Sequence, residues 1–425
     1  MDRRNALRLA LAGAAASAGV VAEAPAIAKP KPTPPPRDVV YRKWSSDADF
    51  ATGAAAGVGI SGGALMFNSA IGQRTYTDPF TGSTGSYDYA TWTSPEVQLG
   101  FAATEAIASW TASTPGGSWV EIEMRGVTAL GNTTVWYTLG RWAADDTVIA
   151  RTSVPAQSDL DGRVAIDTFI AAAGHGLTRW QLRVTLLRPV GTTVIPQVRS
   201  VGAVASKLPA PGSVVASTPQ TAQGVVLAVP QYSQSIHQGE YPQWNGGGEA
   251  WCSPTSTSMV VAHWGTGPTP GDYAWVDPSY PDPWVDYAAR NTYDSNYAGT
   301  GNWPFNTAYA GRFGLEGFVT RLRSLNEAER FIAAGVPLIC SLSFKKNEIP
   351  GLTYGTNGHL LVLVGFSATG QPVLNDPAAA SNAAVRKTVG RAEFEAAWLN
   401  TSGGIVYVIH PASVALPAAP TQPNW

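Results

Sequence analysis

Two stretches rich in residues that break helices and strands divide this 425-residue chain, and they limit where a hydrophobic core can form. The first, residues 29–37, reads Lys-Pro-Lys-Pro-Thr-Pro-Pro-Pro-Arg and is typical of an extended spacer. The second, residues 208–224, carries prolines among Ser, Thr and Ala. We therefore predict two folded segments, residues 38–207 and 225–412, followed by a C-terminal tail at 413–425.

The composition supports hydrophobic cores and excludes two classes of protein. Hydrophobic residues make up 44% of the chain and the net charge is only −2, which excludes disorder over most of its length. The 28 Lys and Arg residues are spread among 30 Asp and Glu residues, so we expect no basic face and no nucleic-acid partner. After the N-terminal region no stretch is apolar for the roughly 18 residues that a membrane span needs. We expect no membrane anchor.

The first 28 residues have the features of an export signal. Arg3 and Arg4 precede an Ala-, Leu- and Gly-rich stretch, and Ala26-Ile27-Ala28 supplies the small residues that precede a cleavage site. The paired arginines are typical of a twin-arginine signal, and an ordinary secretory signal is the alternative. Both interpretations predict cleavage near Ala28 and a secreted, extracellular protein.

Residues 38–207 have the pattern of an all-β sandwich or jelly roll. Apolar and polar residues alternate along 119–124 and 180–186, and residues 134–139 form a β-branched and aromatic run. Gly-rich turn signals separate these runs, as in β-sandwich domains. We expect most aromatic side chains of this segment in its core; the alternative is that they line a carbohydrate-binding cleft.

The second segment mixes helix and strand patterns, which predicts an α+β domain. The expected helices are 256–263, 325–334 and 391–399, and the expected strands are 337–342, 360–364, 372–375 and 404–410. The aromatic and acidic stretch from Tyr273 to Trp303 is expected to form an irregular wall of a substrate cleft.

Three residues of the second segment, in sequence order, could form a nucleophilic site. Pro254 favours a first helical turn, so Cys252 should lie at or just before a helix N-terminus, where free amides and the helix dipole lower the pKa of a thiol. His359 opens the most apolar strand, and Asp376 ends the next, where it could orient the imidazole. Upstream, the side-chain amide of Gln234 could donate to an oxyanion together with the backbone amide of Cys252.

This arrangement resembles the peptidase C39-like family, which shares the papain-like cysteine-peptidase fold. The matching motifs lie within 229–377 and read V-P-x-Y-x-Q, C-x-P-T-S-x-S-M, G-H-x-x-V-x-V-G-F and N-D-P. The resemblance implies the following roles: nucleophile Cys252, base His359, orienting acid Asp376 and oxyanion donor Gln234.

The chain departs from the family pattern at two places. Ser253 stands where the family helix usually has Gly, and an insert, residues 235–251, separates the candidate oxyanion donor from the nucleophile. Other glutamines are therefore alternatives to Gln234, namely Gln231, Gln238 and Gln243.

No residue pattern indicates a cofactor or a metal. The chain has no Cys-x-x-Cys, and we expect no zinc site from the spacing of His175, His237, His263 and His410. A calcium loop would need denser carboxylates than the stretch from Tyr273 to Trp303 contains.

These features predict a secreted cysteine peptidase or amidohydrolase that acts on a peptide or protein, with cell-wall association and a carbohydrate contact through the first segment as further expectations. The first alternative is a catalytically inactive cell-wall or glycan-binding protein with a papain-like fold. The second is a transglutaminase-like acyl transferase. Such enzymes use the same Cys-His-Asp order, but their Cys and His typically lie closer together in the sequence than Cys252 and His359 do. A Cys252–Cys340 disulfide also stays open, but Cys340 falls within an apolar strand, which favours a buried and inert thiol.

Overall fold

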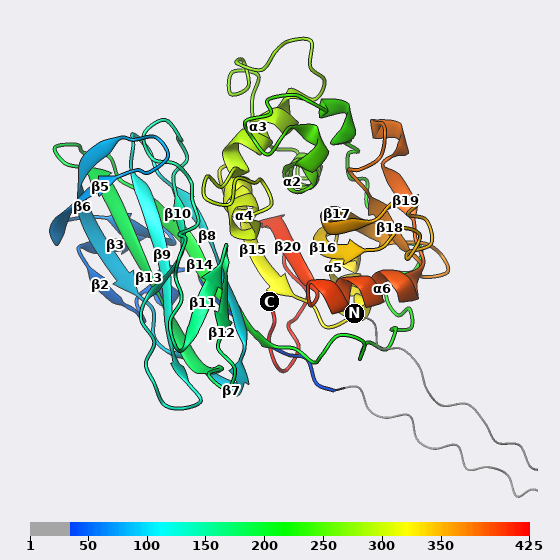
Figure 1. Ribbon diagram of the computed structural model, residues 1–425, viewed down its shortest axis with the longest axis horizontal. Helices are drawn as coiled ribbons and strands as arrows, with labels where there is room; N and C mark the ends of the chain where they lie inside the picture. Colours follow the sequence, from blue (N-terminus) through cyan, green and yellow to red (C-terminus); the bar gives the residue numbers. More distant parts are fainter. Residues whose placement is uncertain (1–34) are drawn as a thin grey trace, which may run out of the picture. The chain divides into compact units, whose positions relative to one another are not determined.

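Antiparallel β-sheets make up most of the secondary structure in residues 35–425, which are the residues that the computed structural model describes. The export signal predicted at residues 1–28, and the spacer as far as residue 34, lie outside the described residues. Residues 35–425 form one compact unit, shown in Figure 1. No helix among them is long and apolar enough to cross a membrane.

The first segment contains two seven-stranded sheets. One sheet consists of β1 (Asp38–Trp44), β3 (Val58–Ser61), β4 (Ala64–Phe67), β8 (Glu105–Ser113), β11 (Gly162–Ala165), β12 (Thr168–Ala171) and β14 (Gln197–Lys207). The other consists of β2 (Ala54–Ala56), β5 (Gly72–Thr77), β6 (Thr84–Thr93), β7 (Val97–Ala103), β9 (Trp119–Thr128), β10 (Tyr137–Trp142) and β13 (Leu177–Pro189). A short helix, α1 (Asp47–Phe50), follows β1.

Both sheets contribute to one hydrophobic core, and tryptophan fills much of it. Trp44, Trp110, Trp142 and Trp180 belong to this core, and each is at most 1% exposed. Among residues 38–207 every tryptophan except Trp136 is buried, so the expectation that the aromatic side chains lie mainly in the core is confirmed. Because these rings are already covered, they do not form an open row that could bind a sugar.

The predicted strands of the first segment are found, with one shift. Residues 119–124 and 180–186 lie within β9 and β13, which pair with each other. The run at 134–139 is displaced, because β10 begins only at Tyr137. The residues before it form a loop in which the Thr134 amide and hydroxyl bind the backbone of Gly126 in β9.

The second segment contains a six-stranded sheet with helices packed against it (Figure 1). Its strand order is β15 (Leu315–Arg321), β20 (Ile405–Pro411), β16 (Leu338–Phe344), β17 (Thr356–Phe366), β18 (Pro372–Asn375) and β19 (Arg386–Thr388). The helices are α2 (Cys252–His263), α3 (Pro283–Thr292), α4 (Trp303–Gly311), α5 (Leu325–Ala333) and α6 (Arg391–Thr401). Helix α2 packs on β17 and on α3 and α4, whereas α6 packs on β16.

The sequence patterns of the second segment predict four of its six strands and the helices α2, α5 and α6 to within a few residues. They miss the strands β15 and β19 and two helices. The stretch from Tyr273 to Trp303 is not irregular throughout, because α3 forms within it, and α4 begins at its end. Prolines occupy the first turns of both helices, Pro283 in α3 and Pro304 in α4, where proline is favoured rather than disruptive. These prolines mark helix starts within the stretch that we expected to be irregular.

The residues predicted as a linker, 208–224, bind to α5 and α6. The buried carboxylate of Glu395 accepts hydrogen bonds from the amide and hydroxyl of Ser217 at 2.6 and 2.9 Å. The buried carboxylate of Glu329 accepts the amides of Gln220 and Thr221 at 2.8 and 2.6 Å. Unpaired carboxylates would be costly inside a protein, so these contacts anchor the connection to the second segment.

The predicted C-terminal tail is also packed against the second segment. The side chain of Asn424 is buried and donates to the Arg321 carbonyl at 2.7 Å. The Trp425 ring lies 4.9 Å from that of Phe331 in α5, measured between centroids. These contacts cover one side of the sheet near β15.

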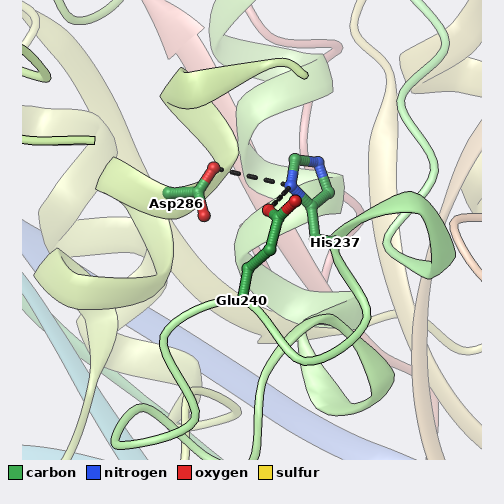
Figure 2. Close-up of side chains that lie close together, drawn as sticks. All are labelled: His237, Glu240 and Asp286. Carbon is green, nitrogen blue, oxygen red and sulfur yellow. Dashed lines mark hydrogen bonds and ion pairs between the residues drawn. The ribbon is translucent and has the colours of Figure 1, made fainter. Parts of the chain in front are cut away.

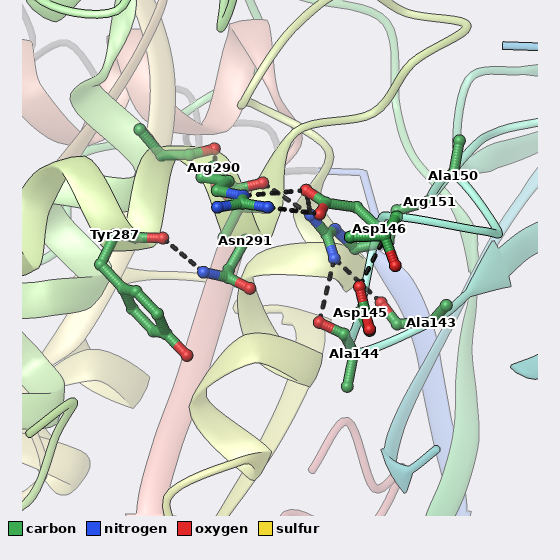
Figure 3. A network of polar contacts seen from close by, with 12 residues as sticks. Ala143, Ala144, Asp145, Asp146, Ala150, Arg151, Tyr287, Arg290 and Asn291 are labelled. Atoms are coloured by element: carbon green, nitrogen blue, oxygen red, sulfur yellow. Dashed lines mark hydrogen bonds and ion pairs between the residues drawn. The ribbon is translucent and has the colours of Figure 1, made fainter. Parts of the chain in front are cut away.

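The two segments share a buried boundary. Helix α4 and strand β15 lie against β8 and β14 of the first segment. Figure 3 shows a polar network at the same boundary, centred on Arg151, whose side chain is 2% exposed. This guanidinium donates to the Ala143 carbonyl at 3.0 Å, to Asp146 at 3.0 Å and to the Arg290 carbonyl of α3 at 2.7 Å. Arg290 in turn binds Asp146 at 2.9 Å. One arginine therefore connects a loop of the first segment to a helix of the second.

Candidate active site

Helix α2 places Cys252 at its first residue, as the position of Pro254 predicts. Three hydroxyls fix the helix against its neighbours. Ser253 binds the Tyr407 hydroxyl at 2.9 Å, Ser256 donates to the Leu360 carbonyl at 3.1 Å, and Thr257 binds Asn306. The Cys252 side chain is half-buried and its thiol is free, at the end of the helix where backbone amides are unpaired.

His359 lies inside β17, not at its beginning, because the strand starts at Thr356. The residue is 4% exposed and pairs with Leu342 of β16. The edges of Phe344 and Tyr354 approach its ring, with centroids 6.5 and 5.8 Å away. These aromatic neighbours restrict the imidazole to one orientation.

Asp376 follows β18 directly and is fully buried. Its Oδ1 atom lies 2.9 Å from His359 Nε2 and accepts a hydrogen bond from the Tyr354 hydroxyl at 3.0 Å. Its Oδ2 atom lies 2.6 Å from Nζ of Lys387. Burial alone would raise the pKa of Asp376, but His359 and Lys387 outweigh burial and hold that pKa well below its usual range. Asp376 is therefore a permanent anion beside the imidazole.

Cys252 and His359 lie close enough that each side chain shifts the pKa of the other. Since Nε2 of His359 is engaged by Asp376, Nδ1 is the ring nitrogen left for the thiol. Burial alone would raise the pKa of Cys252, but the hydrogen bond and positive charge of His359, with backbone amides of Leu360 and Ser253, lower it. Burial alone would lower the pKa of His359, but Asp376 and Cys252 raise it to about 9. Both shifts favour a thiolate paired with an imidazolium.

Gln234 lies close to both halves of this arrangement. Its backbone amide donates to the Pro377 carbonyl at 2.8 Å, next to Asp376, and its side-chain Nε2 donates to the Glu249 carbonyl at 2.8 Å, three residues before Cys252. A carbonyl only accepts hydrogen bonds, so this contact fixes which end of the amide is nitrogen. Nε2 has a second hydrogen that this contact leaves free.

The alternative glutamines are placed differently. Gln231 accepts a hydrogen bond at 3.1 Å from the backbone amide of Arg386, the first residue of β19. Gln238 and Gln243 are exposed. Gln234 is the buried member of the four.

The second cysteine does not take part. Cys340 is fully buried in β16, where it pairs with Leu361, and both cysteines are free thiols. Burial raises the pKa of Cys340, so it stays protonated and inert. The structure thus contains the buried thiol that the sequence favours and not the alternative disulfide.

A cavity of about 610 Å³ lies where the two segments meet. Asp167 of the first segment lines it together with Tyr297, Trp303 and Arg321 of the second. Tyr297 lies near enough to Cys252 that, after burial, the thiolate charge helps to raise the pKa of the phenol. Burial raises the pKa of Asp167 to about 6, although the Trp303 amide opposes this shift. The cavity is therefore lined both by Asp167, a titratable carboxyl of the first segment, and by Tyr297, a neighbour of Cys252.

Sequence patterns missed several residues around the site. Tyr354 and Lys387 bind Asp376 from segments that had no motif. The structure also brings together His237 and Glu240, which lie three residues apart in the sequence, with Asp286 of α3. The His-x-x-Glu spacing was the available signal, whereas nothing local connects it to Asp286.

Family comparisons match both segments of the chain. Residues 40–206 match the family model described as Peptidase C39 N-terminal domain, and residues 226–406 match the one described as Peptidase_C39 like family. A search of the curated proteins finds no match to the chain.

Proposed function

The chain belongs to the peptidase C39-like family, and on that premise we propose that it is a cysteine peptidase or amidohydrolase that cleaves peptide or amide bonds through a thioester. The observation that carries the proposal is the placement of Cys252 at the start of α2 beside His359, whose ring nitrogen lies 2.9 Å from the buried carboxylate of Asp376. A helix N-terminus, an adjacent base and a buried carboxylate are what a thiol needs in order to act as a nucleophile at neutral pH.

The proposed reaction uses the ion pair in two steps. The Cys252 thiolate attacks the carbonyl carbon of the scissile bond, and the imidazolium of His359 gives its Nδ1 proton to the leaving amine. The product of this step is a thioester on Cys252 and a neutral imidazole. Water then attacks the thioester while His359 takes up its proton, which restores the thiolate and the imidazolium. Asp376 keeps the ring oriented and stabilises its charged form throughout.

Two donors are available for the negative oxygen that forms in each step. The backbone amide of Cys252 lies at the first turn of α2, where it has no partner within the helix. The second donor is the free hydrogen on Nε2 of Gln234. The other hydrogen of Nε2 is bonded to the Glu249 carbonyl, which keeps the side-chain amide in place before substrate binds. A preorganised pair of donors of this kind is typical of acyl-transfer enzymes.

We also propose a domain architecture and a location for the protein. We assign residues 38–207 to a β-sandwich domain and residues 225–412 to a papain-like α+β domain, joined by 208–224, and we propose export after cleavage near Ala28. Family membership favours a peptide or protein as the substrate. No described contact favours glycan binding or transglutaminase-type transfer, and the burial of the tryptophans in the first segment gives carbohydrate contact no support.

Selective alkylation tests the proposed nucleophile. The mature protein is treated with sub-stoichiometric iodoacetamide at about pH 6, where an ordinary thiol with a pKa near 8.5 reacts slowly, and the label is mapped by peptide mass spectrometry. We expect rapid labelling of Cys252 and none of Cys340. His359→Gln should slow the labelling, and Cys252→Ala should abolish both the labelling and the hydrolysis of a peptide library. Hydrolysis that survives Cys252→Ala would refute the mechanism.

A further inference from the structure

Three side chains with metal-binding atoms converge inside the second segment, outside the Cys252 site. They are His237, Glu240 and Asp286, and one ligand atom of each lies within 4.8 Å of the others. Figure 2 shows Nδ1 of His237 facing both carboxylates. The distances from Nδ1 are 2.7 Å to Glu240 Oε2 and 3.4 Å to Asp286 Oδ2. The exposed fractions are 0% for His237, 7% for Glu240 and 0% for Asp286.

The charges of this cluster are not balanced by protein. Both carboxylate oxygens of Asp286 are buried and lack a hydrogen-bond partner within residues 35–425. The arginine one turn further along α3, Arg290, binds Asp146 instead. Two carboxylates therefore share one imidazole, and even a protonated His237 leaves a net negative charge in the interior. An unpaired buried charge of this kind costs several kcal/mol unless a cation accompanies it.

We propose that His237, Glu240 and Asp286 bind one divalent transition-metal ion, with zinc as the best fit. A neutral imidazole and two carboxylates together carry two negative charges, which the ion neutralises. Nitrogen and carboxylate oxygen are ordinary zinc ligands, at about 2.0–2.2 Å from the metal. Calcium fits less well, because it takes six to eight oxygen ligands and three residues do not supply them. Binding requires His237 to be deprotonated, so any proton on its ring is released to solvent.

The position of the cluster indicates what a bound ion does. His237 and Glu240 belong to the insert 235–251, which contains two short 3-10 turns at Ser235–His237 and Gly248–Ala250, and Asp286 belongs to α3. The ion therefore joins the insert to a longer helix. The ring of His237 lies 6.0 Å, between centroids, from that of Trp251, the residue before Cys252. Gln234 precedes the same histidine by three residues. The ion thus has a positioning role for the segment that connects the proposed oxyanion donor to the proposed nucleophile.

Metal analysis of the full mature chain tests the site without reference to activity. After exposure to Zn²⁺ and removal of excess ion, we expect about one zinc per chain by elemental mass spectrometry. Chelation with EDTA should lower the Tm by at least about 5 °C, and added Zn²⁺ should restore it. Asp286→Asn and Glu240→Gln should each reduce bound zinc to near zero.

Matched controls separate this site from other ways of binding zinc. His175→Gln removes a more exposed His–Asp pair, His175 with Asp161, and should leave the zinc content unchanged. Cys252→Ala should also leave it unchanged, which excludes zinc held by the reactive thiol. If a cluster variant fails to fold, Co²⁺ bound to the unmodified chain reports the ligands through its visible absorption, which should lack the intense sulfur-to-metal band.

Two results would overturn the proposal. One is a chain that binds no zinc and whose Tm responds to neither EDTA nor Zn²⁺, which would leave a proton shared among the three side chains. The other is zinc that persists in both Asp286→Asn and Glu240→Gln. Neither result bears on the proposed peptidase function, which rests on Cys252, His359 and Asp376.

Discussion

The Nε2 atom of His359 lies 2.9 Å from Oδ1 of Asp376, and this contact determines which ring nitrogen faces the thiol of Cys252. Because Nε2 is engaged, Nδ1 is the atom that exchanges a proton with substrate in the proposed reaction. The carboxylate itself is neutralised on its far side by Lys387 at 2.6 Å. Lys387 therefore partly offsets the negative charge that Asp376 presents to the imidazole. Substitution of Lys387 should change how strongly Asp376 raises the pKa of His359.

Replacing Asp376 with Asn should reduce kcat strongly with a small effect on KM. The amide can donate a hydrogen bond to Nε2 and favour the wrong tautomer, and it removes the charge that stabilises the imidazolium. We expect a loss of about 10²–10⁴-fold in kcat, measured on the best peptide from the library. Lys387→Met is the control, because it removes the neighbouring cation and keeps the carboxylate. It should retain most of the activity, and equal losses in the two variants would contradict this role for Asp376.

The activity should be highest between the two shifted pKa values of the ion pair. Activity rises with pH as Cys252 loses its proton, and this limb lies below the pKa of an ordinary thiol because the pKa of Cys252 is lowered. Activity falls as His359 loses its proton, near its raised pKa of about 9. A profile of kcat/KM against pH measures both limbs. A falling limb near 6.5, the ordinary pKa of histidine, would contradict the ion pair.

The raised pKa of His359 also has a consequence for stability. The folded chain binds this proton more tightly than the unfolded chain, so the contribution to stability is complete below about pH 6.5 and is lost as the pH rises to about 9. Thermal unfolding of the wild type and of His359→Gln at several pH values measures it. The difference in Tm between them should shrink over that interval, and a constant difference would argue against the shift.

The side-chain amide of Gln234 should contribute to the chemical step and not to substrate binding. Gln234→Ala removes one of two oxyanion donors, and we expect kcat to fall by about 10²–10³-fold with KM nearly unchanged. Gln243→Ala, at an exposed position of the insert that follows Gln234, is the matched control and should leave kcat within about twofold of the wild type. A similar kcat in the two variants would assign the oxyanion site to other groups.

Arg151 should be a stability determinant at the boundary between the segments. Replacing it with Met leaves Asp146 and the carbonyls of Ala143 and Arg290 without its hydrogen bonds, and we expect a loss of about 2–4 kcal/mol in the free energy of unfolding. Urea unfolding measures the loss. The exposed pair of Arg179 and Glu96 is the control, because breaking it with Arg179→Met should cost less than about 1 kcal/mol.

Much of the site was predictable because its signals are local. Pro254 indicates the start of the helix that carries Cys252. The apolar run after His359 and the turn at Gly370, where φ is 77°, predict the two adjacent strands that bring His359 and Asp376 together.

The remainder depends on contacts between distant parts of the chain. Glu121 alternates with apolar residues as a solvent-facing strand residue would, yet it is buried, because Arg74 of β5 and Arg141 of β10 cover its carboxylate at 2.9 and 2.7 Å. Asp286 is similar, since only tertiary packing brings it to His237. Sequence periodicity indicates which face a residue occupies but not what another strand or helix places over that face.

The anchoring of residues 208–224 on Glu329 and Glu395 has a consequence for protein engineering. Exchange of the first segment for a different domain would succeed only if the whole connecting stretch stayed with the second segment, since its backbone amides satisfy two buried carboxylates there. A crossover placed inside this stretch would weaken the second segment even where the exchanged domain folds well. The usable junction for a chimaera therefore lies before Leu208.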